Sequence, residues 1–119
     1  MLGGARILIV EDEVLIALDL ADMVESAGAT VVGPAPSTKE ASRLLDAGPV
    51  EAAILDVNLA DGEVTPVLER LVEEGTPVLV YSGGGLPEAL RSRHPELTVL
   101  RKPVPSSRIV SELASLVRR

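Results

Sequence analysis

Residues that could do chemistry stand directly after apolar stretches of this sequence. They comprise three acids, one hydroxyl and one amine, namely Glu11, Asp12, Asp56, Ser82 and Lys102. Clustered carboxylates with no Cys nearby suit a hard cation such as Mg²⁺, which takes oxygen ligands. Asp56 can also act as a nucleophile, because carboxylates form aspartyl phosphates. A Lys and a small hydroxyl stabilise a phosphoryl group in transfer. The set therefore indicates phosphoryl chemistry, provided that the fold brings its members together.

Two kinds of segment alternate along the chain and would carry these residues. Short apolar runs predict strands at 6–10, 30–33, 52–55, 77–81 and 97–100. Apolar residues at helical spacing predict helices at 14–27, from 37 to a stop at 48–49, at 63–74, at 86–93 and from Pro105 or Ser106 onward. The second helix opens with Ser37-Thr38-Lys39-Glu40, the pattern of a capping box in which Glu40 reaches back to the cap.

The alternation of strand and helix, five times over, defines the fold class. The strands are too continuously apolar for a half-exposed antiparallel sheet, so we predict a parallel sheet with helices on both faces. The chain would form one doubly wound α/β domain over residues 6–119, after a disordered lead-in at 1–5. In such a fold the carboxyl ends of the strands gather at one edge, where ligands bind. The five chemical residues would become neighbours there.

Composition excludes several classes of function. The chain has 119 residues, 46% of them hydrophobic, and Tyr81 is its one aromatic residue, so platforms for stacking single-stranded nucleic acid are lacking. A net charge of −7 also argues against direct nucleic-acid binding. The absence of Cys excludes disulfides and thiolate metal sites. No apolar run is long enough to span a membrane, and we expect a soluble, cytoplasmic protein with no membrane partner.

Each chemical residue also has a purely structural interpretation. Glu11-Asp12 could be an acidic helix start, which the helix dipole favours, and Asp56 could simply begin a turn. Ser82 could belong to a plain glycine-rich loop, and Lys102 could be a solvated residue before a turn. His94 is expected at a solvent-exposed helix end. These structural interpretations would have to hold together at every strand end, which favours the functional one.

The set Glu11-Asp12, Asp56, Ser82 and Lys102-Pro103, in this order and each after its strand, resembles the CheY-like receiver domain of two-component response regulators. The resemblance covers the chain from Arg6 to about Val117. It implies a flavodoxin-like sheet with strand order 2-1-3-4-5.

The resemblance also implies a role for each site residue. Asp56 would be the phosphoacceptor, served by a sensor histidine kinase or a phosphotransfer protein. The implied ligands of Mg²⁺ are Glu11 or its water, Asp12, Asp56 and the backbone carbonyl of Asn58. Ser82 and Lys102 would contact the phosphoryl group, and the Lys102-Pro103 peptide would be cis, as X-Pro bonds permit.

Three stretches are closer still to small single-domain receivers of alphaproteobacteria, which often pair with kinases of the HWE or HisKA2 type. They are Val32-Gly33-Pro34-Ala35, Leu55-Asp56-Val57-Asn58-Leu59 and Pro66-Val67. That branch carries the signature Phe-Ala-Thr-Gly-X-Tyr, the FAT GUY motif, after its fourth strand. Here the corresponding residues are Val80-Tyr81-Ser82-Gly83-Gly84-Gly85, so the hydroxyl is kept and both aromatics of the signature are missing.

The switch residues also depart from the usual receiver pattern. Most receivers place Tyr or Phe three residues before the Lys of the fifth strand, and this chain has Val99 there. The rotation of an aromatic ring coupled to the hydroxyl of Ser82 therefore cannot occur at Val99. Tyr81 is the only ring available for a switch, and it could equally be a strand-end Tyr packed on the sheet.

The resulting hypothesis is a phosphoacceptor in two-component, phosphorelay signal transduction rather than an enzyme with external substrates. Phosphorylation would switch the surface formed by the fourth helix, the fifth strand and the fifth helix, to which a downstream protein binds. We expect a stand-alone receiver that is a monomer or weak dimer. Two alternatives stay open: a phosphate-independent interaction module, or an aspartate-nucleophile phosphatase of the haloacid dehalogenase type. The latter places its nucleophile after the first strand, not the third.

Overall fold

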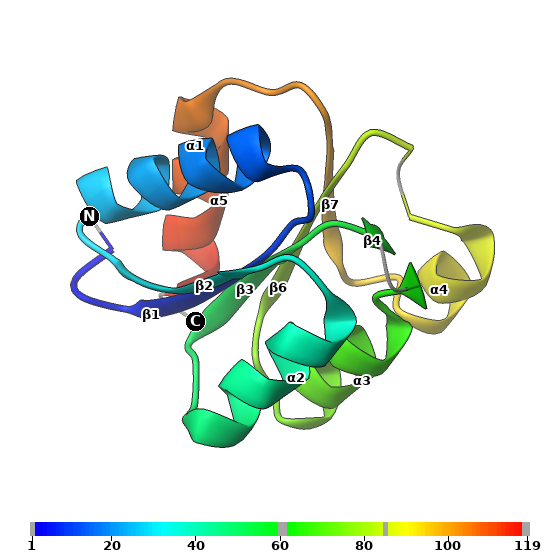
Figure 1. The fold of residues 1–119 in the computed structure, drawn as a ribbon. Helices are drawn as coiled ribbons and strands as arrows, with labels where there is room; N and C mark the ends of the chain where they lie inside the picture. The colour runs from blue at the N-terminus through cyan, green and yellow to red at the C-terminus, as the bar shows by residue number, and fades with distance from the viewer. Residues whose placement is uncertain (1, 60–61, 85, 118–119) are drawn as a thin grey trace.

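A central sheet of five parallel strands organises the molecule (Figure 1). The computed structural model describes residues 2–59, 62–84 and 86–117. The strands of the sheet are β1 (Arg6–Val10), β2 (Thr30–Ala35), β3 (Ala52–Leu55), β6 (Val78–Ser82) and β7 (Thr98–Arg101). Their order is β2-β1-β3-β6-β7. This order confirms the predicted arrangement 2-1-3-4-5 and the doubly wound fold class.

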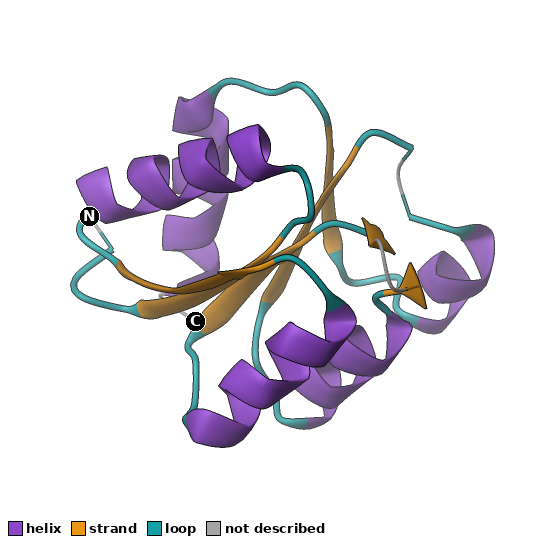
Figure 2. Ribbon diagram, in the orientation of Figure 1, coloured by secondary structure: helices purple, strands orange, loops and turns teal. Residues whose placement is uncertain are grey.

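Five helices cover the two faces of the sheet (Figure 2). They are α1 (Val14–Ser26), α2 (Thr38–Ala47), α3 (Thr65–Glu73), α4 (Glu88–Arg93) and α5 (Ser106–Val117). In Figure 1, α1 and α5 lie together on one side of the sheet, and α2 and α3 lie on the other. None of the helices in the described ranges is both long and apolar enough to cross a bilayer.

The side chains of each central strand alternate between two separate apolar cores, because successive residues of a strand point to opposite faces. Ile54 of β3 and Leu79 of β6 lie in the core shared with α1 and α5. Leu55 of β3 and Val80 of β6 lie in the core shared with α2, α3 and α4. All four side chains are essentially inaccessible to solvent. Burial on both faces explains why these strands read as continuous apolar runs in the sequence.

Local sequence signals set the ends of two elements near the site. The Ser37 Oγ accepts a hydrogen bond from the Glu40 N–H (3.1 Å) at the start of α2, and the Glu40 carboxylate pairs with Arg43. Gly33 has a φ of +99°, and a Cβ there would lie 2.7 Å from the backbone nitrogen of Ala35. Only glycine fits such a position. Gly33 thus shapes the end of β2, whose Ala35 carbonyl accepts the N–H of Glu11 at 2.9 Å.

The structure differs from the sequence-based expectations in three places. A short antiparallel pair, β4 (Asn58–Leu59) and β5 (Gly62–Glu63), precedes α3, which was expected to begin at residue 63. Leu2 is buried and its N–H donates to the carbonyl of Ala27 (2.8 Å), so it is not part of a disordered lead-in. His94, at the end of α4, is buried rather than exposed, and its Nε2 lies 3.9 Å from a carboxylate oxygen of Glu69 of α3.

Candidate functional site

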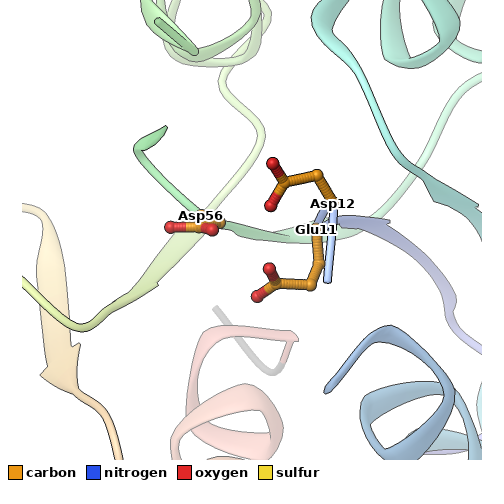
Figure 3. Close-up of side chains that lie close together, drawn as sticks. All are labelled: Glu11, Asp12 and Asp56. Atoms are coloured by element: carbon orange, nitrogen blue, oxygen red, sulfur yellow. The ribbon is translucent and has the colours of Figure 1, made fainter. Parts of the chain in front are cut away.

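Two neighbouring strands bring the acidic residues together at the carboxyl edge of the sheet. Val10 and Leu55, the last residues of β1 and β3, are partners in the parallel register. Glu11 and Asp12 follow the first strand and Asp56 follows the second. The Asp56 N–H continues the ladder by donating to the Val10 carbonyl at 2.9 Å. The strand register therefore dictates that the three side chains emerge next to one another (Figure 3).

The three carboxylates form a compact cluster of oxygen ligands. One oxygen each from Glu11, Asp12 and Asp56 can be chosen so that all three lie within 4.8 Å of one another. Glu11 and Asp56 are buried, while Asp12 is half-buried. Like charges so close together repel one another unless a cation lies between them. This donor set, made of oxygen alone, fits a hard divalent cation such as Mg²⁺.

Lys102 supplies a positive charge to the same cluster. Its Nζ lies 2.8 Å from the Oε1 of Glu11 and 3.6 Å from the Oδ2 of Asp56. The backbone N–H of Lys102 donates to the Ser82 carbonyl at 3.1 Å, and the Lys102-Pro103 peptide is cis. Burial lowers the pKa of Lys102, but its hydrogen bond to Glu11 and the charges of Glu11 and Asp56 together outweigh burial and raise the pKa. Lys102 therefore remains an ammonium at neutral pH.

Glu11 holds its proton more tightly than an ordinary glutamate. Burial raises the pKa of Glu11 above the usual 4.5, and the negative charge of Asp56 adds to the effect. Hydrogen bonds from Lys102 and from the Glu13 N–H work in the opposite direction without cancelling it. The raised pKa reflects the cost of keeping two buried carboxylates charged side by side. A bound cation would relieve that cost.

Ser82 completes the edge from the neighbouring strand. It is the last residue of β6 and is fully buried. Within the described ranges, its Oγ has no hydrogen-bond partner. A buried hydroxyl without a partner is unfavourable by about 1–3 kcal/mol, which a ligand oxygen within its reach would recover. The contact of Ser82 with a phosphoryl group remains a prediction, which this unpartnered hydroxyl supports.

The residues expected to take part in switching lie on opposite faces of the sheet. Val99 of β7 packs, half-buried, against the core of α2, α3 and α4. Tyr81 of β6 lies in the core of α1 and α5, with its ring centroid 5.5 Å from the Nζ of Lys102. Asn58 begins β4 two residues after Asp56, and its carbonyl remains a predicted metal ligand.

Sequence reasoning missed two contacts at this edge. One is the ion pair between Glu11 and Lys102, which are 91 residues apart. The other is the position of the Lys102 ammonium over the Tyr81 ring. The strand order already places Tyr81 beside β7, so the pairing of Tyr81 with Leu100 was a usable signal. The side-chain rotamer of Lys102, which places the ammonium over the ring, could not be predicted from the sequence.

Comparison with known proteins identifies the family to which this edge belongs. The profile of the response regulator receiver domain matches residues 7–114, which includes all the site residues. The chain belongs to the response regulator receiver family. Membership confirms the predicted resemblance and the two-component context that follows from the family. Receivers bind Mg²⁺ at an acidic pocket and interact with histidine kinases or phosphotransfer proteins.

Solved receiver structures resemble this one along nearly its whole length. The solution structure of SdrG from Sphingomonas melonis Fr1 is 37% identical, covers 98% of this chain and 99% of its own, and has a TM-score of 0.80. The response regulator PhyR from Brucella abortus is 32% identical with a TM-score of 0.81, and this chain spans 48% of it. A CheY-like receiver from Methanospirillum hungatei JF-1 is 23% identical, with 96% and 94% of the two chains covered and a TM-score of 0.85. No curated protein sequence matched this receiver.

Proposed function

We propose that this receiver is a phosphoacceptor switch in which Asp56 takes a phosphoryl group from a histidine kinase or phosphotransfer protein. The observation that carries the proposal is the convergence on Asp56 of the two groups that an aspartyl phosphate needs. Oxygens of the acidic ligands for a divalent cation lie within 4.8 Å of one another. The Lys102 ammonium lies 3.6 Å from the Oδ2 of Asp56.

The chemistry is an in-line displacement at phosphorus. An Oδ of Asp56 attacks the phosphorus of a phosphohistidine, an O–P bond forms, the N–P bond breaks, and the imidazole nitrogen keeps the electron pair. Lys102 and the Ser82 hydroxyl stabilise the charge on the phosphoryl oxygens. Glu11, Asp12, Asp56 and the Asn58 carbonyl would hold Mg²⁺, which neutralises the charge that develops there. The receiver promotes only the gain and loss of its own phosphoryl group.

Phosphorylation would alter the surface formed by α4, β7 and α5. A phosphoryl group adds about −1.5 to −2 charges at Asp56. Lys102 and Ser82, which lie at the ends of β7 and β6, are the groups that would respond to this charge. Their displacement would bias neighbouring segments between two arrangements, and a downstream protein would bind one of them. We place this exchange in the cytoplasm.

An apolar patch on α1 beside the acidic cluster is where we expect the phosphodonor protein to dock. Val14, Leu15 and Leu18 are 70%, 78% and 58% exposed, the large apolar side chains that stand out as exposed among the described residues. Val14 and Leu18 share a shallow hollow with Asp12 and Pro34. Exposed apolar side chains grouped in this way mark protein interaction sites. A helix that presents a phosphohistidine above Asp12 would cover them.

The docking patch and the chemistry can be separated by the choice of phosphodonor. We expect the double substitution Leu15→Ser and Leu18→Ser to slow phosphotransfer from a partner histidine kinase by about tenfold or more. The rate with acetyl phosphate should stay within about twofold, because a small donor needs no docking surface. Glu25→Ser, an exposed change at the far end of α1, should leave both rates unchanged. Equal loss with both donors would refute the docking assignment.

The phosphoacceptor assignment is tested by replacing Asp56. We expect Asp56→Asn to abolish phosphate incorporation from acetyl phosphate in the presence of Mg²⁺, measured by intact-protein mass spectrometry. The exposed change Asp22→Asn should have no effect. Incorporation that survives Asp56→Asn would assign the phosphoryl group to another residue. A phosphate-independent module would instead show no spectral change with Mg²⁺ and beryllofluoride, and a phosphatase would turn over phosphomonoesters repeatedly.

Two relatives support different settings for this receiver. SdrG is 37% identical, which supports a receiver of the alphaproteobacterial branch, in which HWE or HisKA2 kinases are the expected partners. PhyR is about twice as long as the matched region, which supports a receiver joined to a further domain. The stand-alone setting is the one we propose, and we expect a monomer or weak dimer. Phosphotransfer profiling against the host's histidine kinases would identify the partner.

A further inference from the structure

The aromatic ring of Tyr81 lies directly beneath the ammonium of the site. Tyr81 is the one aromatic residue of the entire sequence. Its ring centroid is 5.5 Å from the Nζ of Lys102, within the range of a cation–π interaction. Tyr81 is 9% exposed, and the side chain of Lys102 is 16% exposed. Water therefore screens this contact only in part, which strengthens it.

Two interactions position the Lys102 ammonium, an ion pair and a cation–π contact. The Glu11 carboxylate binds it at 2.8 Å, while the ring of Tyr81 faces it from β6. A backbone hydrogen bond supports the contact with the ring, because the Lys102 N–H donates to the carbonyl of Ser82, the residue after Tyr81. A phosphoryl group on Asp56 would draw the ammonium away from Glu11. The ring would keep the Lys102 side chain from swinging out into solvent as it changes partner.

The ring also connects Lys102 to one particular helix. Tyr81 packs in the core that contains Leu100 of β7 and Ile109 and Leu113 of α5. Val99, the position where most receivers have their aromatic residue, lies in the opposite core. A displacement of the ammonium would therefore change the packing of Tyr81 in the core on the α5 side of the sheet. No equivalent ring is present at position 99 to carry it to the α4 side.

We propose that Tyr81 is a positioning residue for Lys102, and that its ring couples the state of the phosphoryl site to the core beneath α5. The proposal rests on the phosphoacceptor function of Asp56, which it deepens. It assigns the ring a role at a position different from that of the usual receiver aromatic. It also predicts that the single tyrosine of the chain reports directly on the charge of the site.

The first test measures the NMR resonances of the Tyr81 ring. Tyrosine labelled with ¹³C in the ring yields the resonances of Tyr81 alone. We expect these resonances to differ between the wild type and Lys102→Met without any phosphoryl analogue. We also expect them to shift when Mg²⁺ and beryllofluoride are added to the wild type, and to shift much less in Lys102→Met. The same spectrum in both proteins, or the same beryllofluoride shift, would overturn the proposal.

The second test measures the rate constant for phosphorylation. At saturating acetyl phosphate and Mg²⁺, Tyr81→Leu should lower the rate constant for phosphorylation by on the order of tenfold, as expected when a catalytic group is misplaced. Tyr81→Phe keeps the ring and should stay within about twofold of the wild type. The affinity for Mg²⁺ should be unchanged in both variants, because its carboxylate ligands are untouched. A Tyr81→Phe variant as slow as Tyr81→Leu would overturn the role of the ring.

A matched control separates positioning from packing. Leu100 is 4% exposed, pairs with Tyr81 across the strands and lies in the same core. Leu100→Ala should lower the thermal midpoint without lowering the phosphorylation rate of the folded protein. If Leu100→Ala is as slow as Tyr81→Leu, the ring only fills space and the proposal fails. If the wild type takes up no phosphate, the phosphoacceptor function fails instead, while the comparison with Lys102→Met still tests the contact.

Discussion

The two faces of the sheet differ where they meet the carboxyl edge. On the α1–α5 face, Tyr81 fills the core with an aromatic ring and the Lys102 ammonium lies over it. On the α2–α4 face, the corresponding place is taken by Val99, beside a hollow of about 320 Å³ that is also lined by Leu86, Arg91 and Arg101. The acidic residues and the lysine of a phosphoryl site can therefore occur together with an aromatic residue on the opposite face of the sheet from the usual one.

Different forces stabilise the acidic site and the apolar core beneath it. The acidic cluster and Lys102 are held by charge, and charge tolerates little change in residue type. The core beneath them is held by apolar packing, which accepts many combinations of similar volume. Three perturbations test this contrast between the two faces.

The largest effect is expected from a cavity in each core. Leu68 of α3 and Leu113 of α5 are both fully buried, one in each core. We expect Leu68→Ala and Leu113→Ala each to lower the free energy of unfolding by about 2–5 kcal/mol. Only Leu113→Ala should shift the ring resonances of Tyr81, because only that cavity lies in the core that contains the ring. Urea unfolding and NMR measure the two effects, and equal ring shifts in both variants would contradict the separation of the faces.

A smaller effect is expected when an aromatic residue is placed at position 99. Because the hollow beside Val99 can accept a ring, Val99→Tyr should change the free energy of unfolding by less than about 1 kcal/mol, below the usual range for an overpacked core. The variant has two tyrosines, and their resonances can be compared in one sample. Lys102→Met in this background should move the Tyr81 signals and leave those of the introduced tyrosine in place. Val99→Leu controls for the added volume.

The smallest effect is expected from pH. The pKa of Glu11 is raised in the folded protein, first by burial and then by Asp56, so above pH 4.5 the folded state binds this proton more readily than the unfolded state does. Without divalent cations, the wild type should therefore gain stability relative to Glu11→Gln as the pH falls through the raised pKa toward 4.5. Chemical unfolding of both proteins between pH 4.5 and 7 measures the difference. A difference that stays constant over this range would show that Glu11 is not the group responsible.

Local sequence signals predicted most elements of the fold. Apolar runs marked the five strands of the sheet, and the Ser37 cap marked the start of α2 within one residue. The hairpin of β4 and β5 was missed because its strands have only two residues each, too short for any periodicity. The burial of His94, whose Nε2 lies 3.9 Å from a carboxylate oxygen of Glu69 on α3, was missed because no local pattern encodes the approach of two helices.

Local patterns in the sequence suffice to predict which chemical groups reach the edge of the sheet. Once the strands are parallel, residues at or just after the end of each strand must lie at that edge, and this rule places Glu11, Asp12, Asp56, Ser82 and Lys102 there. Tertiary structure alone decided how the groups pair. Lys102 bonds to Glu11 more closely than to Asp56 and rests over Tyr81, because side-chain rotamers and burial, which no local pattern encodes, select among several partners within reach.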